Sequence, residues 1–385
     1  MNRETFERVL AESADTLHPV ASARHSPSAI YTDPAFLELE REHVFFKEWL
    51  CCGRAESFER PGDYSAFDLL GEPVVIARGT DGKLTAFSNT CLHRAVRVVE
   101  PGTGNRRAFS CPFHGWTYDL GGRLLLAPRT QETAGFDVRS FRLPQIRVED
   151  WHGWLFINFD PDAAPLSEHV RTLERDFAYL QHDECRLAIT SVNDVECNWK
   201  LVVENLIDLY HVNVVHKTTN GRQFTSDAFR FAPREDGGYY ATFNSGPSTL
   251  TGQPVFGPMP WMHDRPADFA ATGRLRPTFT LFVRIDTIHA SVTWPLSPTR
   301  SRITTYTLLP KRYFDEPDFE ARVVAYRDYQ NKVVSEDKAV LQMMQQGLSS
   351  RMYRPGRMAA GIEQGVHHVE VDNLNRLRAI ASAAR

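Results

Sequence analysis

Long apolar runs and a surplus of positive charge are both absent from this 385-residue sequence. No window approaches the ~18 uninterrupted apolar residues that a membrane span needs, and the N-terminal segment MNRETFERVLAESADTLHPV is charged throughout, unlike a signal peptide. Lys and Arg total 44 against 48 for Asp and Glu, so nothing favours nucleic acid or an anionic membrane as a partner. We therefore expect a cytoplasmic protein, and its length predicts two domains.

Cysteine is also scarce, and six cysteines in this length are too few for a disulfide framework. Two of them stand beside histidines, in the segments CLH at 91–93 and CPFH at 111–114. In a cytoplasmic enzyme such short spacing favours metal ligation. The remaining cysteines are expected to be ordinary thiols: Cys51, Cys52, Cys185 and Cys197.

The pattern of apolar residues predicts a small β domain followed by a mixed domain. Residues 33–47 have helical apolar spacing after an Asp-Pro start, which predicts a helix. From residue 49 to about 160, short β-rich runs alternate with turn signals such as PGD and LGGR, as in an all-β domain. After PDAAP, strands and helices mix, and residues 320–348 predict one long helix. We place the domains at 48–165 and at 1–47 with 166–385.

The two Cys-His pairs form the first candidate metal site. Each pair supplies one sulfur and one nitrogen, and 17 residues separate the pairs. Structural zinc is an alternative, although zinc fingers place Cys with Cys and His with His and carry the second pair on a helix. Mixed pairs in turns between strands favour a 2Fe-2S cluster in which one iron binds two thiolates and the other two imidazoles.

A second candidate site contains His211, His216 and a distant carboxylate. On an ideal helix the two histidines would be about 140° apart, so the helix must bend or stop if both bind one metal. Asp208, three residues before His211, would share its helix face and can hold a ring N–H and fix the tautomer. Asp337 lies on the apolar stripe of the long C-terminal helix, where a metal would offset the cost of burying a carboxylate. Glu336, four residues after Lys332, is expected on the surface.

These segments resemble motifs of a known family. CLHR and CPFHGW, followed by WTYDLGGRL, resemble the ligand loops of Rieske proteins, specifically those of ring-hydroxylating-type oxygenases. The pattern N-W-K…E-N-x-x-D-x-Y-H-x-x-x-x-H from residue 198 resembles their iron-binding motif, and E-D…Q-x-G-L from residue 336 resembles their third-ligand helix. The resemblance runs from about residue 30 onward. It implies 2Fe-2S ligands Cys91, His93, Cys111 and His114, and iron ligands His211, His216 and Asp337. The family loop often reads C-x-H-R-G, whereas Ala95 follows Arg94 here, and we expect ligation to be unaffected.

The resemblance also implies a fold and an activity. It implies an α+β chain: an all-β Rieske domain and a helix-grip (START-like) catalytic domain with a central antiparallel sheet. The activity would be that of a terminal oxygenase that uses O₂. Electrons would come from a separate NAD(P)H-dependent reductase, directly or through a ferredoxin, since no G-x-G-x-x-G follows a strand in this chain. The family's head-to-tail homotrimer would let Asp208 connect His211 of one subunit to His114 of the next.

The sequence leaves several substrates open. Relatives that oxidise quaternary ammonium compounds often carry Glu where this chain has Asp208, which favours hydroxylation of a small aromatic acid. Oxidative N- or O-demethylation of a quaternary ammonium or methoxy compound is the alternative, and a Rieske electron carrier, which needs only the first site, is the non-enzyme alternative. Aromatic-rich stretches such as FTLFVRIDT are candidates for a pocket. Three arginines are candidates for binding a carboxylate or sulfonate: Arg222, Arg230 and Arg284.

Overall fold

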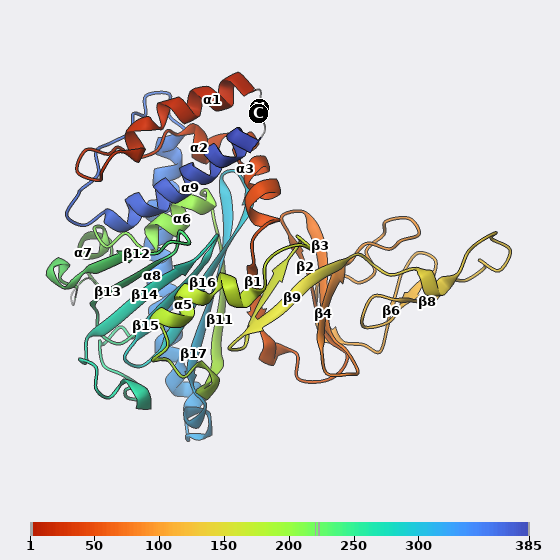
Figure 1. Cartoon of the computed structure of the whole chain (residues 1–385). Helices are drawn as coiled ribbons and strands as arrows, with labels where there is room; N and C mark the ends of the chain where they lie inside the picture. Colours follow the sequence, from red (N-terminus) through yellow and green to blue (C-terminus); the bar gives the residue numbers. More distant parts are fainter. Residues whose placement is uncertain (1–2, 220, 222–223, 384–385) are drawn as a thin grey trace. The chain divides into compact units, whose positions relative to one another are not determined.

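The computed structural model describes residues 3–219, 221 and 224–383. They form two compact units, one of Phe46–Leu166 and the other of Met1–Phe45 with Ser167–Arg385. Figure 1 draws both, coloured along the sequence. None of the helices in the described part of the chain combines the length and apolarity that crossing a membrane requires.

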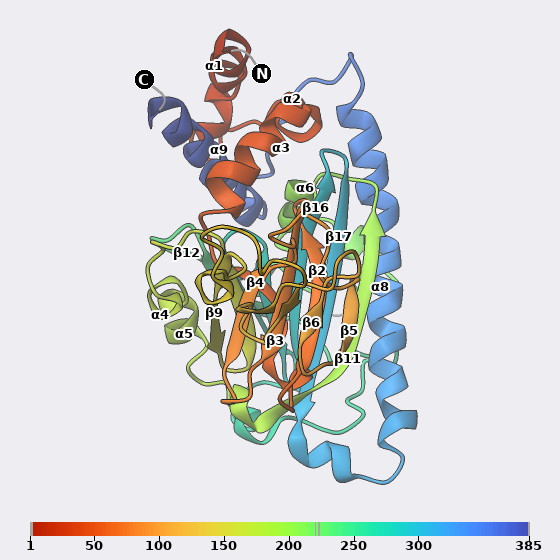
Figure 2. The ribbon, with the colours of Figure 1, turned by 90° about the vertical axis from the view of Figure 1, so that its right-hand side faces the viewer.

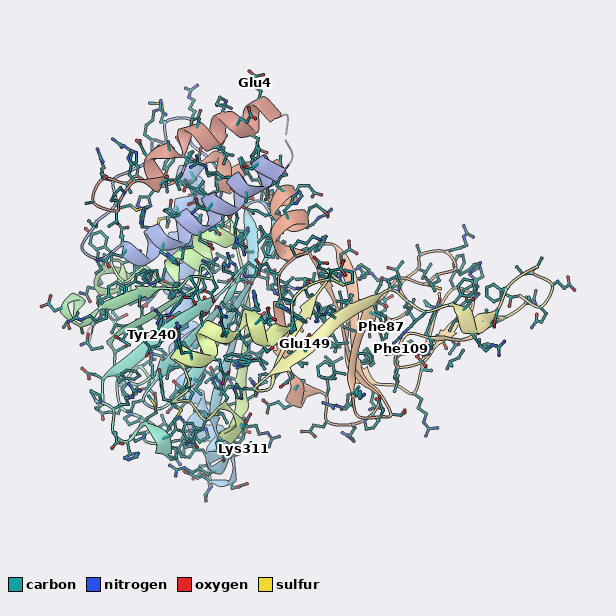
Figure 3. All side chains as sticks on the ribbon, in the orientation of Figure 1. Glu4, Phe87, Phe109, Glu149, Tyr240 and Lys311 are labelled. Atoms are coloured by element: carbon teal, nitrogen blue, oxygen red, sulfur yellow. The ribbon has the colours of Figure 1, made fainter. Side chains whose placement is uncertain are left out.

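The smaller unit is built from β-strands, as its short apolar runs and turn signals predict, with short 3₁₀ helices at Ala55–Ser57 and Val138–Ser140. A seven-stranded sheet has the order β1-β10-β9-β4-β3-β2-β5, a second sheet has the order β6-β7-β8, and all pairings are antiparallel. Phe87 and Phe109, labelled in Figure 3, pack edge to face in its core with ring centroids 5.8 Å apart. The strands are β1 (Leu50–Arg54), β2 (Asp63–Leu69), β3 (Glu72–Arg78), β4 (Leu84–Ser88), β5 (Gly102–Asn105), β6 (Phe109–Ser110), β7 (Thr117–Tyr118), β8 (Leu124–Leu126), β9 (Gln145–Trp151) and β10 (Trp154–Asn158).

The larger unit is built on one antiparallel sheet of seven strands. Its order is β11-β17-β16-β15-β14-β13-β12, so β12 to β17 form a meander and β11 pairs with β17 along its whole length. This order leaves β12 at one edge and β15 in the middle of the sheet. The strands are β11 (Cys185–Val195), β12 (Arg230–Pro233), β13 (Tyr239–Asn244), β14 (Phe269–Leu275), β15 (Phe279–Arg284), β16 (Ile288–Ser297) and β17 (Arg300–Pro310).

One long helix lies along this sheet. The helix α8 (Phe319–Leu348) contacts β11, and Figure 2 shows it running along the strands for most of their length. The long helix expected over 320–348 is therefore confirmed, and it gives the sheet its helix-grip arrangement. The helix α6 (Trp199–Asn205) contacts α8, β16 and β17, while α9 (Gln364–Ala383) contacts α6 and α1 (Arg3–Glu12).

The short helices complete this unit. The helix expected over 33–47 begins at Pro34, where Asp33 accepts the N–H of Ala35 at 2.9 Å, and it ends in a π-helical turn over Arg41–Phe45. That helix is α3 (Pro34–Glu40). The other short helices are α2 (Ala29–Thr32), α4 (Leu166–His169), α5 (Arg171–Asp176) and α7 (Val212–Val215).

A buried ion pair fixes α6, and α6 leads into the histidine segment. Lys200 Nζ lies 2.7 Å from Glu40 Oε1, Trp199 Nε1 donates to Glu40 Oε2 at 2.7 Å, and all three side chains are buried. Asn198 caps the helix by accepting the N–H of Lys200 at 3.0 Å. Removing one partner of such a pair leaves an uncompensated buried charge, which typically costs about 3–5 kcal/mol. The start of the histidine segment is therefore held rigidly against the body of this unit.

Candidate metal centres and substrate cavity

The two Cys-His loops of the β unit share one backbone design. Cys91 donates its N–H to Val96 and accepts from Ala95, and Cys111 does the same with Trp116 and Gly115, all between 2.8 and 3.0 Å. Ala95 and Gly115 both have left-handed φ values, 58° and 71°. Glycine adopts this conformation freely, whereas Ala strains the backbone by about 1–2 kcal/mol. The loop thus keeps its shape at Ala95, as ligation requires.

The four predicted cluster ligands converge in pairs of like atoms. His93 Nδ1 and His114 Nδ1 lie 3.1 Å apart at the surface, and the Cys91 and Cys111 side chains are buried. Burial and the contact with Cys91 raise the pKa of the Cys111 thiol. Sulfur beside sulfur and nitrogen beside nitrogen fits a 2Fe-2S cluster with one iron on each pair.

Two aromatic residues that the sequence analysis did not assign support this site. The Tyr118 hydroxyl lies 3.3 Å from Cys91 Sγ and accepts the N–H of Leu92 at 3.1 Å. The His93 ring stacks on Trp116 with centroids 5.1 Å apart and an 8° angle. Both belong to the run WTYDL, which follows the second loop and could have predicted that these residues contact the cluster ligands.

The second candidate site brings together the predicted iron ligands of the larger unit. His211 Nε2 and His216 Nε2 are 3.2 Å apart, and Asp337 Oδ1 lies 3.4 Å from the first and 3.0 Å from the second. His211 directly precedes the single-turn helix α7 and His216 directly follows it. The segment between the histidines is thus a single helical turn, and the expected stop falls at its end, where His216 leaves the helical conformation with φ -98° and ψ 25°.

The site fits a divalent metal held by two imidazoles and one carboxylate. Asp208 Oδ2 lies 3.1 Å from His211 Nδ1, and Glu336 Oε2 lies 2.8 Å from His216 Nδ1. With both Nδ1–H groups donated to carboxylates, both Nε2 lone pairs are free to face a shared centre. Asp337 Oδ1 is buried and faces both Nε2 atoms, an arrangement that a cation bound to all three atoms would satisfy.

Protons occupy this site when no metal is bound. Burial lowers the pKa of His211, but the hydrogen bonds to Asp208 and Asp337 outweigh it and raise the pKa to about 9. Burial raises the pKa of Asp337, and its contacts with the two histidines more than offset this and lower it to about 2. A metal ion must therefore displace a proton from His211 at neutral pH.

The structure corrects two details of the sequence analysis. Glu336 was expected on the surface, yet its side chain is 11% exposed and also accepts the hydroxyls of Thr218 and Thr219 at 3.1 and 2.9 Å. Its contact with Lys332 is longer, at 3.4 Å. Asp208 contacts His211 as expected, but through an irregular turn after α6 and not along one helix face. Both carboxylates orient a histidine.

A cavity of about 170 Å³ adjoins the three convergent ligands. Its wall combines aromatic and aliphatic side chains with a few polar groups. It is lined by, among others, Leu209, Val212, Phe224, Phe243, Ser245, Ser248, Phe282, Arg284, His289, Ser291, Ile303, Tyr329, Val333, Lys338 and Leu341, together with Asp208, His211, His216 and Asp337. This volume is below the roughly 300–1,000 Å³ of pockets for drug-sized ligands, so the cavity suits only a small organic molecule.

The three candidate arginines have different positions. Arg284 lines the cavity. Arg230 is exposed and donates to the backbone carbonyls of Asp227 and Phe229 at 2.7 and 2.8 Å. Arg222 lies outside the described residues. The stretch FTLFVRIDT thus contributes Phe282 and Arg284 to the cavity wall.

His289 in the cavity wall is held neutral. Its Nδ1 lies 2.9 Å from Thr307 Oγ1, and its Nε2 lies 2.9 Å from both Ser248 Oγ and Thr287 Oγ1. Burial and the Arg284 charge lower the pKa of His289 to about 3. At neutral pH the ring therefore adds no charge to the cavity.

This shift predicts acid-sensitive stability. Between the unfolded pKa of 6.5 and the folded pKa of about 3, the unfolded state binds the extra proton, so stability falls as pH falls through this range. Between pH 7 and pH 5 we expect the wild type to lose about 2 kcal/mol more than His289→Gln. Urea unfolding followed by near-UV circular dichroism at both pH values measures the difference. The exposed control His263→Gln should behave as the wild type, and equal losses in all three proteins would contradict the expectation.

Family comparisons agree with both centres. The family model described as ring hydroxylating alpha subunit (catalytic domain) matches residues 175–376, and that of the Rieske [2Fe-2S] domain matches residues 48–142. The chain belongs to the Rieske-type oxygenase alpha subunits. The predicted family, the two-part fold and the pairing of a 2Fe-2S cluster with a mononuclear iron are thereby confirmed, and a Rieske electron carrier is excluded.

Several curated Rieske oxygenases resemble the chain. It is 28% identical to choline monooxygenase of Beta vulgaris over 384 residues, which cover 95% of this chain and 80% of the relative. It is 27% identical to the glycine betaine monooxygenase oxygenase subunit of Pseudomonas aeruginosa, covering 94% and 91%. The carnitine monooxygenase oxygenase subunit of Escherichia coli is 31% identical over about half of each chain.

Solved structures show the same fold. A quaternary ammonium Rieske monooxygenase superimposes with a TM-score of 0.79 at 22% identity, covering 96% of this chain and 98% of that one. Naphthalene 1,2-dioxygenase from Rhodococcus sp. gives 0.76 at 17% identity, covering 100% and 98%. Because both classes share the fold, the fold alone does not select the substrate.

Proposed function

We propose that this Rieske oxygenase monooxygenates a quaternary ammonium compound at a C–H bond next to the nitrogen. The reaction is R–H + O₂ + 2 e⁻ + 2 H⁺ → R–OH + H₂O, and a separate NAD(P)H-dependent reductase supplies the electrons. The observation that carries the proposal is the small, aromatic-lined cavity that opens on His211, His216 and Asp337. The likeness to choline and glycine betaine monooxygenases over more than nine tenths of the chain supports the substrate class.

The side chains of the cavity have distinct roles in this reaction. Aromatic faces attract a quaternary ammonium ion that has no N–H to donate, and Phe224 and Phe243 offer rings 6.4 Å apart and 67° inclined. Phe282 adds a third ring to the wall. His211, His216 and Asp337 would hold the iron, which when bound supplies O₂ activation with electrons from the cluster. Asp208 and Glu336 keep the two imidazoles in the ligating tautomer.

The aromatic-acid substrate expected from the sequence has support only at the level of the family. That expectation relied on Asp208 where quaternary ammonium oxidisers often carry Glu. In the structure Asp208 still reaches His211 Nδ1 at 3.1 Å, because the turn after α6 brings its backbone close enough. The shorter side chain therefore does not separate the two substrate classes.

The proposed working assembly is a head-to-tail homotrimer. His114 is exposed at the cluster site, and the Asp208 side chain is 24% exposed beside His211. Both groups that the trimer would bring together are thus accessible from outside their own unit. A cyclic heterologous interface can close three subunits in this way.

Metal analysis and turnover test the proposal together. Protein purified without oxygen should contain about three irons and about two acid-labile sulfides per chain, one cluster plus one iron. With a reductase and NADH it should couple O₂ uptake to oxidation of a quaternary ammonium compound from a panel of choline, glycine betaine and carnitine. Zinc in place of iron, or O₂ uptake coupled only to an aromatic acid such as benzoate, would overturn it.

A further inference from the structure

Arg284 is a buried cation without a matching anion. It ends the central strand β15, is 9% exposed and lines the cavity. Its Nη1 donates to Ser245 Oγ and to the carbonyl of Gly246, and no carboxylate of the described residues lies within ion-pair distance of it. Asp286, two residues on, is buried; burial raises its pKa to about 6, although its hydrogen bond with Tyr326 and the charge of Arg284, which lies outside ion-pair distance, act to lower it. A buried charge of this kind is costly unless it is paired.

Arg284 has N–H groups to offer to a ligand in the cavity. Among the described residues the hydrogen bonds of Arg284 all use Nη1, so Nε and Nη2 remain available to a ligand in the space that Arg284 lines. The Tyr329 ring centroid lies 6.0 Å from Arg284 Cζ, and Tyr329 lines the same space. A guanidinium with two free N–H groups beside a phenol matches the two oxygens of a carboxylate.

The cavity is polarised along α8. Tyr329, beside Arg284, precedes Asp337 by eight residues, which corresponds to about 12 Å of helix. His289 beside Arg284 is neutral, and Lys338, the other cation in the wall, directly follows Asp337. Arg284 therefore stands with Tyr329 at one end of the cavity, and the metal-ligand end carries the carboxylates of Asp208 and Asp337 together with the Lys338 cation.

We propose that Arg284, assisted by Tyr329, binds the carboxylate of the substrate, and that the substrate is a zwitterionic betaine. The proposal rests on the function proposed above and narrows it. A betaine neutralises Arg284 with its carboxylate while its ammonium group lies among the aromatic rings near the metal ligands. A plain cation such as choline leaves Arg284 unpaired and is repelled by it, so it binds more weakly.

Binding to the oxidised holoenzyme, without reductase, tests this separately from turnover. Calorimetry with carnitine, glycine betaine, choline and benzoate gives Kd values for the wild type, Arg284→Met and the control Arg230→Met. We expect at least one zwitterion to bind the wild type about tenfold or more tightly than choline. Arg284→Met should weaken that zwitterion about 10- to 100-fold and leave choline unchanged or tighter, since a charge-assisted bidentate contact is lost. Arg230→Met should match the wild type.

A second variant guards against misfolding. If Arg284→Met does not fold, Arg284→Lys can be used instead. Lys keeps the positive charge but cannot donate two parallel N–H bonds to one carboxylate, so the zwitterion should bind about tenfold more weakly. Wild-type protein that binds choline as tightly as the zwitterions overturns the proposal, as does a folded Arg284 variant with unchanged zwitterion affinity. If only benzoate binds, and Arg284→Met weakens its binding, then the betaine is not the substrate and the proposed function is wrong, although Arg284 still binds a carboxylate. If choline binds tightly and is turned over, the claim that the substrate is a zwitterion is wrong, whereas the proposed function stands.

Discussion

Asp337→Ala is expected to contain about two irons and two sulfides per chain instead of three and two, and to turn over about a thousandfold more slowly or worse. The variant removes the carboxylate that approaches both His211 Nε2 and His216 Nε2. Two imidazoles alone provide no negative charge to hold Fe(II), and the activation of O₂ depends on that metal. The cluster belongs to the other unit and should stay intact.

Three measurements separate loss of iron from loss of fold. Iron and sulfide analysis counts the metals, the EPR spectrum of the reduced cluster reports on the Rieske site, and O₂ uptake gives the rate. The matched control is Asp328→Asn, an exposed acid on the same helix, which should equal the wild type in all three. Full iron content or wild-type turnover in Asp337→Ala would remove Asp337 from the ligand set.

The role of Asp337 could be predicted from the sequence. Its position on the apolar stripe of a helix without breakers predicted an inward carboxylate, and α8 runs over Phe319–Leu348 as expected. The stripe is imperfect, because Leu341 is buried whereas Met344 is 43% exposed. The cluster ligands could be predicted equally well, because each Cys-His pair is local in sequence and its loop geometry is determined within a few residues.

The roles of other residues depend on which distant segments of the chain pack together, and these roles could not be predicted from the sequence. Glu336 and Asp337 are neighbours on α8, about 100° apart around the helix, and only the position of His216, Thr218 and Thr219 against that helix shows that both face the site. Arg230 and Arg284 are alike in local sequence context, yet β12 is an edge strand and β15 is central. Strand order is a long-range property, so it decided which arginine lines the cavity.

Asp208→Asn should retain all three irons and both sulfides yet turn over more than about a hundredfold more slowly. Asn has nearly the same shape but only one oxygen. Turned toward His211, that oxygen can still accept the Nδ1–H that Asp208 Oδ2 accepts at 3.1 Å, while the amide NH₂ replaces the Oδ1 that accepts the N–H of Tyr210 at 2.8 Å. The ring should therefore stay in place and the iron should stay bound. What the variant removes is the negative charge on a side chain that is 24% exposed beside a His211 side chain that is 14% exposed.

The slower turnover of Asp208→Asn is expected to come from slower electron transfer between the cluster and the iron. In the proposed trimer, Asp208 joins His211 to His114 of the next subunit, so losing its charge should slow electron passage between the two sites without emptying either. Stopped-flow reoxidation of the chemically reduced cluster on mixing with O₂ and substrate measures that step, and the exposed variant Asp264→Asn is the control. Normal reoxidation and turnover would exclude Asp208 as the connection. Loss of iron would instead show that its charge is needed to hold His211, so only a slow transfer with intact metals supports a bridge between subunits.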